Sequence, residues 1–269
     1  MDIRVLGDGP PEPFLSAADL LETEHELDLP VHVRLRADPD ERTWAAHYDD
    51  RHVLNISRHA ATSAMARELA LHELAHMVRY EAGHPSHTQS TDEALFLGLA
   101  GHSVERRRLA HCYQIANHMK DIYADDITLS VGPGRKVVGL LESQLAAAVA
   151  DRPGGFDRPG APDRSGADSH SAADSRPDSR LVSAGADPDI TAVNAAFALG
   201  LLERHDLVSP DHRLYDLARA AAADAPGVSL ESFKRRFRSL ADDPSESDYR
   251  KELVDVTKTY ATAPAPAAD

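Results

Sequence analysis

The chain has little cysteine, few aromatic residues and no long apolar run. One cysteine, Cys112, among 269 residues excludes both a disulfide framework and a cysteine-based zinc ribbon. No stretch approaches the roughly 18 uninterrupted apolar residues of a transmembrane helix, so we expect no membrane partner. Residues 1–13 lack the charged-then-apolar pattern of a secretory signal. These absences favour a soluble, cytoplasmic protein.

Lysine is also scarce, and the charge balance is strongly acidic. Only five of the 29 basic residues are lysine, and 44 acidic residues bring the formal net charge to −15. This composition resembles that of proteins from salt-loving archaea, whose dense carboxylate surfaces keep them hydrated in multimolar salt. Basic clusters occur only at Arg106–Arg108 and Lys234–Arg238, so we expect no nucleic-acid partner.

The sequence H-E-x-x-H at His72–His76 lies in a predicted helix, Ala64–Tyr80. The i, i+4 spacing places both imidazoles on one helix face, one turn apart, where they can bind one metal ion. Glu73 lies between them, in position to hold a metal-bound water. A structural pair of histidines is the alternative interpretation, but buried polar side chains without partners are costly. The pattern is typical of zinc-dependent peptidases.

A catalytic zinc site needs a third protein ligand and leaves the fourth position to water. The metzincin pattern would require glycine at 79 and histidine at 82, where the chain has Arg79 and Ala82, so that class is excluded. A second helix, predicted from His102 to about Asp126, carries a polar stripe that could instead be a solvated face. Its candidate ligands are Glu105, Asp121, Asp125 and Asp126, with His111 and His118 as nitrogen alternatives.

The run Asp121-Ile-Tyr-Ala-Asp125 resembles the E-x-x-A-D of the gluzincin metallopeptidases that include the CAAX-processing endopeptidases. The resemblance implies that Asp121 binds zinc and that Asp125 hydrogen-bonds a zinc-binding histidine and fixes its tautomer. Aspartate stands where those enzymes have glutamate, which would require a closer approach of the two helices. Glu105 is the runner-up, because it has the expected identity but is followed four residues later by Leu109. Residues 72–84 and 117–127 also resemble an archaeal family of metallopeptidase-like proteins with no assigned substrate.

The expected fold class is α+β: a mainly helical, zincin-like core with a small antiparallel sheet before the H-E-x-x-H helix. The edge strand of such a sheet could line the cleft and accept an extended substrate as an extra strand. Residues 1–150 are predicted to form the metallopeptidase domain, and residues 151–188, rich in Pro, Gly, Asp and Ser, a disordered acidic linker. Residues 189–260 are predicted to form a C-terminal helical bundle or cap, and 261–269 a disordered tail.

The leading functional hypothesis is a zinc-dependent hydrolase, a peptidase in which Zn²⁺ is held by His72, His76 and Asp121. Glu73 would activate a metal-bound water against a peptide or protein substrate. A catalytically inactive peptidase-fold module with structural zinc, used for binding or regulation, is the alternative. A hydrolase that acts on another kind of carbonyl is a third interpretation. Candidate donors to the oxyanion, each more typical of a structural role, are His84, His87, Tyr80 and Tyr123.

Overall fold

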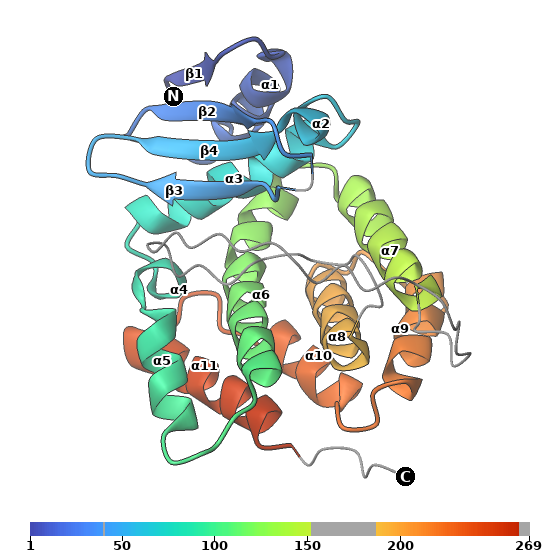
Figure 1. The fold of residues 1–269 in the computed structure, drawn as a ribbon. Coiled ribbons are helices and arrows are strands. Elements are labelled where there is room, and N and C mark those ends of the chain that lie inside the picture. The colour runs from blue at the N-terminus through green and yellow to red at the C-terminus, as the bar shows by residue number, and fades with distance from the viewer. Residues whose placement is uncertain (40, 152–186, 264–269) are drawn as a thin grey trace, which may run out of the picture.

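The computed structural model describes residues 1–39, 41–151 and 187–263. It is an α+β protein made mainly of helices with one small sheet, as predicted. In Figure 1 the sheet lies at one end, and α6 (Arg106–Val131) runs from beneath it through the centre of the helical part. The predicted linker and tail lie mostly outside the described residues. No helix among the described residues has both the length and the apolar character needed to cross a membrane.

The sheet mixes parallel and antiparallel strands, which corrects the prediction of an antiparallel sheet. Its order is β1 (Ile3–Leu6), β2 (Val31–Arg36), β4 (His52–Ser57) and β3 (Trp44–His47). Only β3 and β4 pair antiparallel, whereas β1 with β2 and β2 with β4 pair parallel. Helix α1 (Glu12–Leu21) occupies the connection from β1 to β2, and a crossover of that length lets both strands run in one direction.

A first core joins the sheet to the helices beneath it. The H-E-x-x-H helix is α3 (Ala66–Glu81), which packs with α1, with the one-turn helix α2 (Arg58–Ala61) and with the C-terminal part of α6. Fully buried apolar side chains from these elements form one cluster: Phe14, Val33, Leu54, Ile56, Leu71, Leu74, Ala75 and Ala124. The burial of this apolar surface holds α3 between the sheet and α6.

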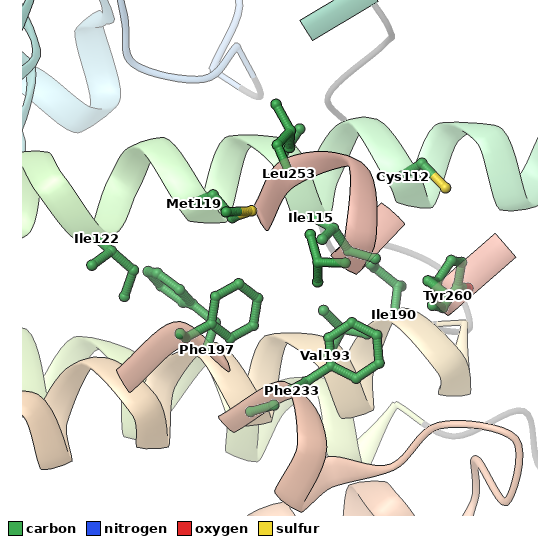
Figure 2. Packing of buried hydrophobic residues seen from close by; sticks show 14 of the residues in the cluster. Cys112, Ile115, Met119, Ile122, Ile190, Val193, Phe197, Phe233, Leu253 and Tyr260 are labelled. Atoms are coloured by element: carbon green, nitrogen blue, oxygen red, sulfur yellow. The ribbon is translucent and has the colours of Figure 1, made fainter. Parts of the chain in front are cut away.

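A second core lies on the other side of α6. Six of its residues come from α6, and most of the rest come from α5 (Thr91–Leu99), α8 (Pro188–Arg204), α10 (Leu230–Arg238) and α11 (Glu246–Ala261). Figure 2 shows the aliphatic side chains of α6 facing the rings and aliphatic groups of α8, α10 and α11. The helices predicted as a C-terminal bundle or cap therefore share a core with the segment before residue 151.

Two further helices complete the C-terminal side of the molecule. Helices α7 (Gly134–Ala150) and α9 (Arg213–Ala223) pack with α8 around a third, smaller apolar cluster. Helix α8 therefore contributes to two cores, on two of its faces, and every residue from Ile190 to Leu202 except Asn194 is buried. A helix that is apolar almost all round is expected at such a central position.

We expect Leu253→Ala to lower the free energy of unfolding by about 2–5 kcal/mol, because it leaves a cavity in the core shared by α6 and α11. Leu97→Ala is the matched control on α5, because Leu97 is 49% exposed whereas Leu253 is fully buried. Its effect should stay within about 0.5 kcal/mol. Urea denaturation in molar salt measures both, and equal losses in the two variants would contradict this view of the core.

Candidate metal centre

Helix α3 carries both histidines of the motif on one face. Alanine, leucine, glutamate and arginine dominate Ala66–Glu81, and all are strong helix formers. The rings of His72 and His76 lie edge to face, with centroids 4.6 Å apart, and their Nε2 atoms are 3.0 Å apart. When both Nε2 atoms are unprotonated, two nitrogen lone pairs held this close suit a shared cation.

The end of α3 is fixed by a glycine turn that leads directly into α4 (Pro85–Thr88). Gly83 has φ +64°, a left-handed conformation that favours glycine. Its N–H bonds to the carbonyl of Tyr80, and the N–H of His84 bonds to the carbonyl of Arg79. These two bonds form a Schellman motif, which closes the helix and reverses the chain. The reversal brings His87 of α4 back beside His76.

Helix α6 supplies a carboxylate to the same point. The Oδ1 atom of Asp121 lies 3.4 Å from Nε2 of His76 and 3.9 Å from Nε2 of His72. All three ligand atoms lie within 4.8 Å of one another. Ligands bound to zinc at about 2.0–2.1 Å in a tetrahedron are roughly 3.3 Å apart, so this triangle is close to one face of that tetrahedron. His72, His76 and Asp121 therefore fit a small divalent metal ion.

Each histidine is oriented by a partner at its other ring nitrogen. Oδ1 of Asp125 lies 2.7 Å from Nδ1 of His72, and Nε2 of His87 lies 2.7 Å from Nδ1 of His76. These contacts leave both Nε2 atoms directed at Asp121. Hydrogen bonds of this kind set the tautomer and ring orientation of metal-binding histidines. His87 is held in turn by Ser86, whose Oγ is 2.7 Å from Nδ1 of His87.

Asp121 is supported from the C-terminal helices. Its Oδ2 lies 3.5 Å from Nδ1 of His118, one turn earlier on α6. Nε2 of His118 lies 2.8 Å from Oδ1 of Asn194 on α8, and the imidazole stacks on Phe197 at 4.3 Å between centroids. Asn194 and Phe197 are 73 and 76 residues beyond Asp121, so no local sequence pattern could have found them.

Glu73 faces the edge of the sheet next to the metal-binding atoms. Its side chain is 7% exposed and accepts a hydrogen bond from the backbone N–H of Ala45 on β3. Burial raises the pKa of Glu73, and the neighbouring His76 and His72 oppose this shift. A carboxyl group whose pKa is moved upward towards neutrality is suited to accept and return a proton.

Opposite charges surround the ligand atoms in the metal-free protein. Burial lowers the pKa of His72, but Asp125, with Asp121 and Glu73, outweighs it and raises that pKa to about 10. Burial opposes ionisation of Asp121, yet contacts with His118 and His76 hold its pKa well below the ordinary value. Burial lowers the pKa of His87 to about 2, so this ring is neutral and can accept the Nδ1–H of His76.

The runner-up ligand lies far from this site. Glu105 is exposed at the N-cap of α6, about 24 Å along the helix axis from Asp121. Asp126 pairs with Arg204 and His205 instead. His111 contacts Tyr260 and Asp187, also away from the ligand atoms.

The other proposed oxyanion donors have structural partners. Nδ1 of His84 is 2.7 Å from Ser86 Oγ, and the ring of His84 packs against buried Tyr123. Tyr80 stacks on His47 with ring centroids 4.1 Å apart. Of the four residues named as oxyanion donors, only His87 contacts a candidate metal-binding histidine. It contacts Nδ1 of His76, not the Nε2 atom that is directed at Asp121.

A family model matches residues 1–262 of the chain. The chain belongs to the DUF5781 family. That family is described as one of unknown function. No curated protein and no solved structure matches the chain.

Asp121→Ala should lower zinc affinity by more than about 100-fold, because it removes one of three ligand atoms. Loss of a residue that only hydrogen-bonds a metal ligand typically costs about 10- to 100-fold. Glu105→Ala should keep one zinc per chain, since its carboxylate is remote from the site. Elemental analysis after dialysis measures both. Normal zinc in Asp121→Ala would remove Asp121 from the ligand set of this DUF5781 protein.

Zinc binding at pH 7 should release at least one proton. The pKa of about 10 means that metal-free His72 is protonated at neutral pH, whereas a ligand imidazole must be neutral. Apparent zinc affinity should therefore rise with pH up to about 10. Calorimetric titration in buffers of different ionisation enthalpy counts the protons. Asp125→Asn should release fewer, because it removes the carboxylate that raises this pKa, and an unchanged count would contradict the assignment.

Proposed function

We propose that this protein is a zinc-dependent peptidase. The observation that carries the proposal is the convergence of His72 Nε2, His76 Nε2 and Asp121 Oδ1 within 4.8 Å, beside the buried carboxylate of Glu73. Two imidazoles and one carboxylate suit zinc better than magnesium or calcium, which prefer oxygen ligands alone. A zinc ion held there would polarise a carbonyl and lower the pKa of its bound water towards roughly 7.

Glu73 is assigned the proton transfers of the reaction. It follows His72 directly in α3, and its burial raises its pKa, so it can take a proton from an attacking water and give it to the departing amine. The hydrogen bond from Ala45 N–H restrains the carboxylate at the sheet edge. Asp125 and His87 keep the two histidines in the tautomers that direct Nε2 towards the site.

The open edge of β3 supports an extended peptide as substrate. Strand β3 is outermost in the sheet, and the N–H of Tyr48, just beyond it, bonds to Arg51 on the β4 side. Because the backbone N–H and C=O groups of successive residues point to opposite sides of a strand, those of Ala45 and His47 point away from β4. Ala45 N–H is bonded to Glu73, so the remaining outward groups could pair with a substrate strand alongside the catalytic carboxylate.

An inactive module with structural zinc is supported less well. Structural zinc sites are usually closed by four protein ligands, whereas catalytic sites keep one position open. Among the described residues, the group that could hold a metal has three members. A buried carboxylate such as Glu73 also has no evident use in a purely structural site.

The proposal predicts that Glu73→Gln lowers peptide hydrolysis by about 10²- to 10⁴-fold while zinc content stays at one ion per chain. The measurement is cleavage of denatured casein in multimolar salt, with elemental analysis of the same samples. Glu105→Gln is the matched control, because it removes an exposed carboxylate remote from the ligand atoms.

Full peptidase activity in Glu73→Gln would exclude this mechanism. The zinc-loaded wild type could instead leave casein intact but hydrolyse p-nitrophenyl acetate. If Glu73→Gln also lost this esterase activity, the result would favour a hydrolase that acts on another kind of carbonyl. No cleavage of either substrate would favour the inactive module.

A further inference from the structure

Two basic side chains beside the candidate metal centre have no counter-ion among the described residues. Arg42 and Lys120 are both partly buried, yet neither makes a hydrogen bond or ion pair with any of the residues that the structure describes. Two other partly buried basic residues are paired: Arg36 with Glu41, and Arg204 with Asp126. Removing a charge from water without a partner is costly, so these two cations require an explanation.

The two cations approach the ligand carboxylate from different elements. Lys120 precedes Asp121 on α6, and its charge acts on His47 of β3 and on His87 of α4. Arg42 lies two residues before β3, and Asp121 is the charged group that acts on it. Both charges therefore act in the region that Asp121 shares with β3 and α4, and the open edge of β3 is where an extended substrate would lie.

The acidic groups nearby do not balance these charges once a metal is bound. Asp121 would then be shared with a divalent ion, and Asp125 is committed to His72. Asp92 also acts on Lys120, but it is exposed and its Oδ1 accepts a hydrogen bond from Tyr113 Oη at 2.7 Å. Burial lowers the pKa of both Arg42 and Lys120, as expected for cations that lack a close anion.

We propose that Arg42 and Lys120 bind a carboxylate of the substrate close to the bond that is cleaved. This inference rests on the proposed peptidase function and adds a substrate class to it. A guanidinium presents two parallel N–H donors that match a carboxylate, and an ammonium adds a second point charge. The carboxylate comes from a free C-terminus or from an aspartate or glutamate side chain.

The test measures binding rather than turnover, on zinc-loaded Glu73→Gln protein. Three fluorescein-labelled Ala-Gly-Leu hexapeptides are compared by anisotropy: one with a free C-terminus, one amidated, and one amidated with an internal aspartate. At least one carboxylate-bearing peptide should bind about tenfold or more tighter than the neutral amide, as expected for charge-assisted hydrogen bonds. Tighter binding of the free acid or of the aspartate peptide identifies the source of the carboxylate.

Arg42→Gln and Lys120→Gln should each bring the ratio of the two dissociation constants, neutral amide to carboxylate-bearing peptide, closer to one. Arg135→Gln and Lys251→Gln are the matched controls, because both remove exposed charges elsewhere, and they should leave this ratio unchanged. Zinc content is measured in each variant. If Lys120→Gln loses zinc, then Arg42→Gln, which is remote in sequence from every ligand, decides the result.

Equal binding of all three peptides, or a preference that survives both substitutions, overturns the inference. Casein cleavage by the wild type separates this failure from failure of the proposed function. Cleavage without any carboxylate preference contradicts the substrate class alone. Absence of both cleavage and peptide binding contradicts the peptidase itself and with it this inference.

Discussion

The close approach of α3 to α6 is the constraint on which the candidate metal centre depends. Asp121 has one methylene less than a glutamate, so the two helix axes must be near each other for its Oδ1 to reach both Nε2 atoms. Ala75 of α3 and Ala124 of α6 are fully buried in the same apolar cluster, and small side chains permit such an approach. Nε of Arg79 also donates to the carbonyl of Tyr123, which ties the backbone of α6 to α3.

Helix α6 has two functions, on two of its faces. Its apolar residues Cys112, Ile115 and Met119 belong to the core shared with the C-terminal helices. Its acidic residues Asp121 and Asp125 face α3. A long helix packed on both sides is rigid, so the carboxylates are presented by the scaffold rather than by a loop. The positions of Asp121 and Asp125 therefore depend on how well the apolar face of α6 is packed.

Local patterns in the sequence predicted the helix, the histidine pair and Asp121 as a ligand candidate, because helical spacing depends only on neighbouring residues. They failed where a contact joins distant segments. The direction of β2 relative to β1 depends on how α1 packs, and the support of Asp121 by Asn194 depends on where α8 docks. His87 was visible as a polar residue after Gly83, but its contact with His76 follows from the turn geometry. That Arg42 has no ion-pair partner among the described residues can be recognised only after those residues have been placed.

The contact between His118 and Asn194 determines how much of the chain must be synthesised before the support of Asp121 is complete. A nascent chain that has emerged as far as α7 already contains all three ligand residues and Glu73. It still lacks Asn194, which contacts the His118 ring, and Phe197, on which that ring stacks. The support of the third ligand is thus completed only after α8 has left the ribosome. A metal centre built this way would reach its final form late in synthesis, after the sheet and helices α1 to α7 have been translated.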